Sequence, residues 1–150
     1  MIAVCGIDPG VIHTGCVEIL FNPETSNISV SSEVVEGIDV EKIKAFAQDT
    51  DRVFVEAYKP RSNFAVDTYM QESIGELKKA LPSARFLNNM GVKKVVTTEL
   101  MQLLEVWDFD TPTHHQDLRS AARILLFGMI KDPDLNKLLT DIVLNHTETS

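Results

Sequence analysis

The sequence has no apolar run of about 18 residues, the length of a transmembrane helix, and its first residues lack the basic segment and apolar stretch of a secretory signal. We therefore expect a cytoplasmic protein without a membrane-bound part. Cysteine is also scarce. The only two, Cys5 and Cys16, are more typical of small core residues in a reducing compartment than of a disulfide or a metal site.

Basic residues are outnumbered, with 14 Lys and Arg against 22 Asp and Glu and a formal net charge of −8. Taken over the whole chain, this charge disfavours binding to a polyanion such as DNA. The basic residues are concentrated, however, in residues 51–100, which carry 8 basic and 6 acidic side chains. This distribution is compatible with a local basic surface and equally with scattered solvated side chains.

The apolar pattern alternates between the periods of strands and of helices, and it contains no internal repeat or linker. Apolar or alternating runs predict five strands, at residues 2–7, 16–21, 28–35, 52–56 and 84–87. Amphipathic spacing predicts helices at residues 40–47, 63–81, 93–106, 113–129 and 134–144. With 44% hydrophobic residues, the chain is expected to form a single domain over residues 1–150.

Two acidic residues stand where an apolar strand ends. Asp8 follows the first predicted strand and opens an Asp-Pro-Gly corner, and Glu56 closes the run RVFVE. A tight turn explains Asp8 taken alone, because Pro9 presets φ and Gly10 accepts a positive φ. The same pattern at Glu56 favours a pair of functional carboxylates at the edge of a sheet.

A third cluster opens the helix expected at residues 113–129, with the sequence THHQDLRSAARILL. Thr113 suits the N-cap position, and a spacing of three places His114 and Asp117 on one face of the first turn. His115 would point about 100° away from that face. The turn would present two metal-ligating groups. An ordinary surface explanation is equally open, because acids are favoured at helix N-termini and a histidine near a cap is often exposed.

Together, Asp8, Glu56, His114 and Asp117 provide the ligands of a divalent-metal site, on rigid elements that converge on one edge of a sheet. Without a cation, the carboxylates would repel one another. Three antiparallel strands come first, followed by alternating helices and strands. This order predicts an α/β fold with an RNase H-like mixed five-stranded sheet and helices on both faces.

The sequence resembles the RuvC-type Holliday junction resolvases, particularly the small bacteriophage members. The resemblance spans roughly residues 2–129 and rests on GIDPG followed by Thr14 and Gly15, on VFVEAY, on GVKKVV and on HHQDLRSAARI. It implies a homodimeric endonuclease that uses two Mg²⁺ or Mn²⁺ ions per active site and nicks four-way or other branched DNA symmetrically. If the protein is encoded by a phage, its compartment would be the cytoplasm of the bacterial host. No small-molecule cofactor is expected.

The resemblance also implies roles for individual residues. Asp8, Glu56 and Asp117 match the acidic metal ligands of the family, and His114 stands where the family has Asp or His. Lys93 matches a basic residue near the scissile phosphate and completes the expected catalytic set. Because an imidazole nitrogen suits Mn²⁺ better than Mg²⁺, His114 is expected to favour Mn²⁺. The expected DNA-binding residues are Tyr58, Lys59, Arg61, Lys93 and Lys94.

The helix expected at residues 63–81 carries an apolar stripe and Gly75, which would allow a second copy of the chain to approach closely. The stripe suits a dimer face, and it equally suits packing on the chain's own sheet.

Two other classes of function stay open. A strand, an acid and a glycine corner also begin the actin-like ATPase fold, whose loop binds nucleotide phosphates, although that fold normally needs two such lobes. A non-catalytic dimer of the same fold that binds branched DNA is the second alternative. The joint presence of Asp8, Glu56 and Asp117 favours catalysis over such a scaffold.

Overall fold

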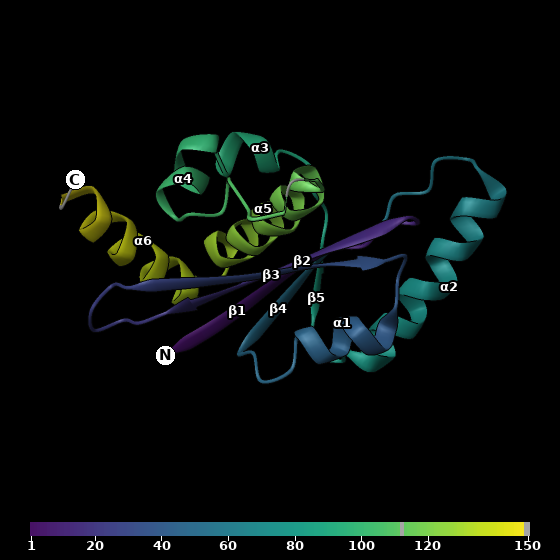
Figure 1. Cartoon of the computed structure of the whole chain (residues 1–150), viewed down its shortest axis with the longest axis horizontal. Helices are drawn as coiled ribbons and strands as arrows, with labels where there is room; N and C mark the ends of the chain where they lie inside the picture. The colour runs from purple at the N-terminus through teal and green to yellow at the C-terminus, as the bar shows by residue number, and fades with distance from the viewer. Residues whose placement is uncertain (112, 149–150) are drawn as a thin grey trace.

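A computed structural model describes residues 1–111 and 113–148 and contains a five-stranded mixed sheet (Figure 1). The strands are β1 (Ile2–Asp8), β2 (His13–Phe21), β3 (Ile28–Glu36), β4 (Arg52–Glu56) and β5 (Arg85–Leu87). Their spatial order is β3-β2-β1-β4-β5. β1, β2 and β3 form an antiparallel meander, and β4 and β5 run parallel to β1. The mixed sheet expected from the sequence is therefore confirmed.

Helices cover both faces of the sheet, as expected (Figure 1). In the described residues they are α1 (Val40–Phe46), α2 (Phe64–Ala80), α3 (Val92–Val95), α4 (Thr98–Leu103), α5 (His115–Lys131) and α6 (Pro133–Glu148). α1 and α2 bury apolar residues against one face. α3 to α6 cover the other face, and α5 lies at the centre of that larger core. None of the helices in the described part of the chain has the length and apolar character needed to cross a membrane.

The prediction of a single helix at residues 93–106 is wrong. Two short helices, α3 and α4, take its place, and Val96 between them has an extended backbone. The Thr97 side chain accepts a hydrogen bond of 3.2 Å from the backbone N–H of Leu100. A side-chain oxygen in this position starts a new helix, so the chain changes direction at Thr97.

The starts of α5 and β2 also differ from the prediction. Thr113 is not the N-cap of α5, because the helix begins at His115 and His114 occupies the N-cap position. β2 begins at His13, earlier than predicted, because its pairing with β3 continues as far as His13 opposite Glu36. Both shifts move histidines onto the edge of the sheet where β1 ends.

Glycine at two strand positions lets α5 lie directly on the sheet. A Cβ atom on Gly6 would lie 2.2 Å from the backbone oxygen of Ala121, and one on Gly15 would lie 2.2 Å from that of Asp117. These distances are far below van der Waals contact, so a side chain at either position would push the helix away. The two glycines therefore fix the height of α5 above β1 and β2.

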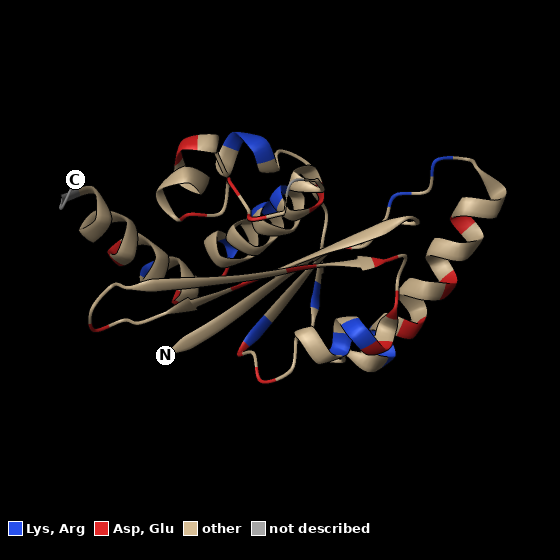
Figure 2. Cartoon of the chain, viewed as in Figure 1, with Lys and Arg blue, Asp and Glu red and all other residues tan. Residues whose placement is uncertain are grey.

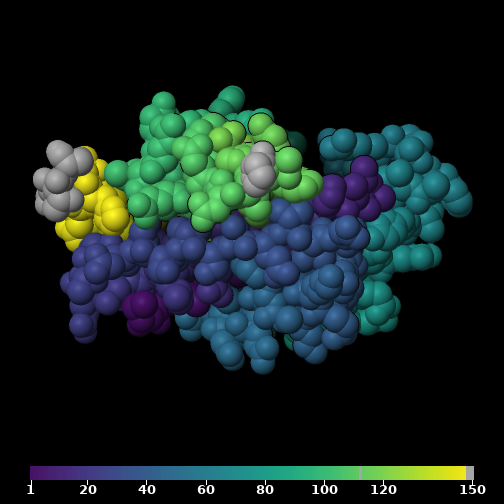
Figure 3. All heavy atoms as spheres, in the orientation of Figure 1, coloured from purple at the N-terminus to yellow at the C-terminus, as the bar shows by residue number. Residues whose placement is uncertain are grey.

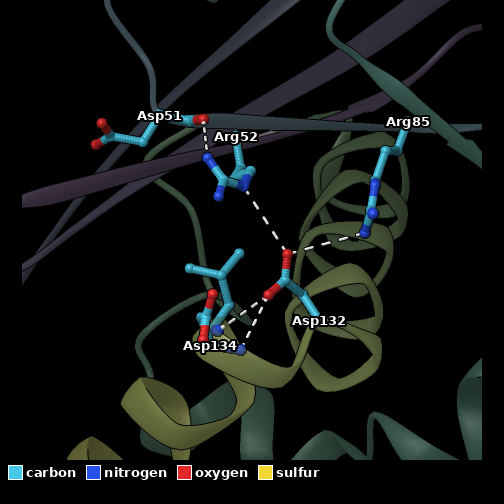
Figure 4. Close-up of polar contacts among 6 residues, drawn as sticks. Asp51, Arg52, Arg85, Asp132 and Asp134 are labelled. Carbon is cyan, nitrogen blue, oxygen red and sulfur yellow. Dashed lines mark hydrogen bonds and ion pairs between the residues drawn. The ribbon is translucent and has the colours of Figure 1, made fainter.

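The C-terminal end of α5 is fastened by Asp132, which is buried between α5 and α6 (Figure 4). Its Oδ2 lies 3.8 Å from Arg52 Nε, at the start of β4, and 3.8 Å from Arg85 Nη1, at the start of β5. Its Oδ1 accepts hydrogen bonds from the backbone N–H groups of Asp134 and Leu135. The N-terminal end of α5 consequently lies toward the edge where β1 and β4 end.

The apolar stripe of α2 packs on the chain's own sheet, which is one of the two arrangements the sequence allowed. A Cβ atom on Gly75 would meet open space, so this glycine serves no close approach within the chain. Cys5 and Cys16 are buried and free in the same core, as expected. The buried part of the stripe consists of Met70, Ile74 and Leu77.

The contact between α5 and the sheet can be tested with two glycine substitutions. Gly6→Ala is expected to lower the free energy of unfolding by about 2 kcal/mol or more, because the new methyl group collides with backbone. Gly75→Ala, in the open interior of α2, is expected to raise it by up to about 1 kcal/mol. Urea denaturation of both variants measures the difference. Equal stability of Gly6→Ala and the wild type would contradict the close contact.

Candidate metal centre and nucleic-acid groove

Asp8, Glu56 and Asp117 meet at one edge of the sheet. β1 and β4 are parallel neighbours whose register pairs Ile7 with Val55, so the residues that follow, Asp8 and Glu56, end adjacent strands. Asp117 lies in the first turn of α5, which the close contact with β2 brings over the same edge. The structure thus brings together the three acids that the sequence singled out.

The surroundings of Asp8 are strongly acidic. Burial, a hydrogen bond with Glu56 and the negative charges of Glu56 and Asp117 together raise the pKa of Asp8 to about 9. In the described residues, no lysine or arginine forms an ion pair with any of the three acids. Neighbouring carboxylates without a compensating positive charge are the type of donor that a divalent cation such as Mg²⁺ or Mn²⁺ takes. The residues present therefore fit such an ion.

Two histidines lie next to this acidic group. His114 Nδ1 is 3.4 Å from Asp117 Oδ2, and the ring of His13 lies against that of His114, with the centroids 4.2 Å apart. The ligand atoms of His13, His114 and Asp117 all lie within 4.8 Å of one another. His115, as expected, is directed elsewhere and contacts Phe109. The sequence analysis missed His13, because its place at this edge depends on the pairing of β2 with β3 and on the position of α5.

His114 has a left-handed backbone conformation, with φ 70° and ψ 18°. For a residue with a side chain, this conformation costs about 1–2 kcal/mol. The His114 side chain makes no capping hydrogen bond to the helix and is paired with Asp117 instead. The strained turn therefore serves to direct the imidazole toward the acid.

A groove with a volume of about 480 Å³ opens beside Asp8 and Glu56. Its walls come from the β1–β2 loop, α2, α3 and α5. Figure 3 shows that loop in purple, on the surface between the green helices and the teal α2. Figure 2 shows basic segments on α3 and on the loop before α2, the elements that contribute Lys93, Lys59 and Arg61 to the lining of the groove. The charged and amide residues of its lining are Asp8, Glu56, Lys59, Arg61, Asn89, Lys93 and Arg123.

Most of the residues expected to bind DNA belong to this lining. Lys59, Arg61 and Lys93 line the groove, whereas Lys94 does not. Tyr58 also lines it, but its hydroxyl donates a hydrogen bond to the carboxylate of Asp67, which raises the pKa of Tyr58. Tyr58 therefore presents its ring, rather than a free hydroxyl, to the groove.

Arg123 is a groove residue that the sequence analysis missed. Its Nε is buried and, among the described residues, has no hydrogen-bond partner. Burial and the nearby charge of Arg119 lower the pKa of Arg123. Arg119 itself is engaged, because its Nε donates to the backbone oxygen of Trp107 and its guanidinium stacks on the Trp107 ring. Arg123 thus lines the groove together with Asp8 and Glu56 and lies 5.7 Å from the centre of the Trp107 ring, but it forms no ion pair with an acid of the described residues.

Asn89 is a second missed residue. Its side-chain amide donates a hydrogen bond of 2.7 Å to Glu56 Oε1. An amide donor leaves the carboxylate charged and fixes its rotamer, so Asn89 orients Glu56 without neutralising it.

The chain matches no protein-family model and no curated protein. Among solved structures it is similar to Thermus thermophilus RuvC in complex with a Holliday junction substrate, with a TM-score of 0.61 and 18% identity, covering 84% of this chain and 91% of that one. A second structure of T. thermophilus RuvC matches with a TM-score of 0.58 and 19% identity, covering 83% of this chain and 92% of that one. The fowlpox virus resolvase in complex with its substrate Holliday junction DNA matches with a TM-score of 0.51 and 11% identity, covering 92% of this chain and 99% of that one. At these identities the likeness shows the fold, and the expected RNase H-like architecture is confirmed.

The raised pKa of Asp8 predicts how the stability of the metal-free protein depends on pH. Between about pH 4 and pH 9 the native state binds a proton at Asp8 that the unfolded chain has released, so the free energy of unfolding falls as pH rises through this range. Asp8→Asn removes this dependence. At pH 8 the variant is expected to be more stable than the wild type by about 1 kcal/mol or more, which corresponds to one pKa unit. Urea denaturation in the presence of a chelator measures the difference, which should vanish near pH 4.

Asp67→Asn provides a control of opposite sign. A hydrogen bond from the Tyr58 hydroxyl and hydrogen bonds from backbone N–H groups lower the pKa of Asp67. This carboxylate therefore contributes stability above its unfolded pKa, and the contribution is lost as pH falls. The variant should be less stable than the wild type at neutral pH. A stabilising effect of both substitutions at pH 8 would refute the assignment.

Proposed function

We propose that the protein is a divalent-metal-dependent endonuclease that nicks branched DNA, including four-way junctions, symmetrically as a homodimer. The observation that carries this proposal is the convergence of Asp8, Glu56 and Asp117 beside a groove lined with lysine and arginine. The fold is shared with T. thermophilus RuvC and the fowlpox virus resolvase, whose structures contain Holliday junctions. Fold and site together support the same reaction class.

The carboxylates of Asp8, Glu56 and Asp117, with the imidazole of His114, would hold two divalent ions. When bound, such ions supply Lewis-acid activation of water and of the scissile phosphate. Asn89 keeps Glu56 in one orientation through its hydrogen bond. Hydrolysis would leave a 5′ phosphate and a 3′ hydroxyl.

The basic residues of the groove would bind the phosphate that is cut and its neighbours. Lys93 and Arg123 line the same groove as Asp8 and Glu56, where they would donate to non-bridging phosphate oxygens. Lys59 and Arg61 would contact phosphates further along the strand.

The overall charge of −8 supports selectivity for branched DNA. Outside the groove, an acidic surface repels the backbone of linear duplex and leaves few nonspecific contacts. A dimer would present two basic grooves related by a twofold axis, and a junction offers two equivalent strands to them. Analytical ultracentrifugation of the free protein tests the dimer directly.

Three substitutions in the acidic group test catalysis. Asp8→Asn, Glu56→Gln and Asp117→Asn are each expected to lower the rate of junction nicking by about 100-fold or more, because each removes a charged ligand. Junction binding should be retained, because loss of negative charge does not weaken contact with a polyanion. Nicking of a labelled four-way junction with Mg²⁺ or Mn²⁺ is read on a denaturing gel, and binding by fluorescence anisotropy.

The matched control is Glu72→Gln, which removes an exposed acid on α2 and should leave nicking unchanged. Junction binding by the wild type without nicking under either metal would favour a non-catalytic DNA-binding dimer and overturn the proposal. Near wild-type nicking by any of the three acid variants would remove that residue from the site.

The groove cations test the DNA contacts. Lys93→Ala and Arg123→Ala are each expected to weaken junction binding and to reduce the slope of log K against log salt by about one, since each removes one phosphate contact. Lys94→Ala carries the same change of charge on the adjacent residue but lies outside the groove lining. It should therefore cause the smaller loss, as measured by salt titrations of the three variants. Equal losses would mean that only the net charge of the protein matters.

A further inference from the structure

His13 brings a second nitrogen donor to the pair formed by His114 and Asp117. It stands at the first residue of β2, whereas the other two belong to the start of α5, so the three come from two separate elements. We propose that His13, His114 and Asp117 form a transition-metal site that binds Zn²⁺ in preference to Mg²⁺. The site shares His114 and Asp117 with the proposed nuclease centre, but Zn²⁺ binding is measured without DNA and does not require nuclease activity.

The distances support one ion shared by the three side chains. With metal–ligand bonds of about 2.0–2.1 Å, a tetrahedral zinc site places its ligand atoms roughly 3.3 Å apart. His114 Nδ1 and Asp117 Oδ2 already lie 3.4 Å apart. The third ligand atom, from His13, lies within 4.8 Å of both, so the His13 ring has to move closer to complete the set.

The backbone keeps the three donors close before any ion binds. His13 is held by pairing with Glu36 of β3, and Asp117 by the contact of α5 with Gly15. The left-handed conformation of His114 directs its ring toward both of them. All three side chains are half-buried, so an ion can reach them from solvent.

The chemistry of the donors decides the choice of metal. Two imidazole nitrogens and one carboxylate suit Zn²⁺ and neighbouring transition metals, and leave a position open for water or substrate. Mg²⁺ prefers oxygen ligands in strict octahedral geometry, which the edge formed by Asp8 and Glu56 supplies better. Asp117 lies between the two donor sets, because its charge also acts on Asp8. One end of the site is therefore rich in nitrogen and the other rich in oxygen.

The test measures metal binding to the full chain without DNA. Isothermal titration calorimetry with Zn²⁺, and visible absorption with Co²⁺ as a spectroscopic substitute, are applied to the wild type and to His13→Gln. Loss of a residue that only supports a metal ligand lowers metal affinity by about 10- to 100-fold. Because His13 would be a ligand itself, its loss should weaken Zn²⁺ binding by about 100-fold or more. Binding of Mg²⁺ should change far less.

Two variants serve as controls. His115→Gln removes the adjacent histidine, which contacts Phe109 and lies outside the cluster, and should bind Zn²⁺ as the wild type does. Asp8→Asn should also retain Zn²⁺ binding, because Asp8 is not one of the three donors. Strong loss in Asp8→Asn with none in His13→Gln would place the ion among the carboxylates and overturn the proposal.

A measurement on the unmodified protein guards against a misfolded variant. Nitrogen-15 NMR of the imidazole rings should show Zn²⁺-dependent shifts for His13 and His114 and none for His115 or His146. Unchanged signals from His13 on saturation with Zn²⁺ would refute the site. A protein that binds Zn²⁺ through His13 but does not nick branched DNA would instead refute only the proposed nuclease function.

Discussion

The contact between α5 and the glycines of β1 and β2 is the constraint on which the site depends. Because Gly6 and Gly15 have no side chains, the helix backbone rests on the sheet. This contact carries Asp117 to the edge where Asp8 ends β1. The other end of the helix is held by Asp132, so the helix is fixed at both ends. The position of a functional side chain is thus set by packing in the core rather than by a loop.

Charge is distributed unevenly over the molecule, and the uneven distribution defines the groove. The chain carries an excess of eight negative charges, yet four basic side chains line the groove beside the acidic edge. The acids repel one another and favour a cation, whereas the surrounding lysines and arginines favour an anion. A phosphate together with a divalent ion satisfies both requirements at once. Neither ligand alone would neutralise this site.

Much of the fold and part of the site could be predicted from the sequence. Asp8 and Glu56 were found because an acid at the end of an apolar strand is a local pattern, and the ends of neighbouring parallel strands meet. His13 was not found in this way. Its position at the site depends on the pairing of β2 with β3 and on how closely α5 packs on the sheet, and no local sequence pattern encodes either. Arg123 lies within an ordinary helical repeat, and only the folded chain shows that its Nε, among the described residues, has no hydrogen-bond partner. The break at Thr97 could have been predicted from its capping side chain.

β5 has three residues and lies at the edge of the sheet, where strands open most readily. On one side Arg85 ties it to Asp132, and on the other it pairs with β4. Asn89 follows the strand by two residues and holds Glu56. Fraying of β5 would therefore release the Glu56 carboxylate while leaving Asp8 and Asp117 in place. Amide hydrogen exchange in this short strand would thus report the fraction of molecules in which one ligand is out of position.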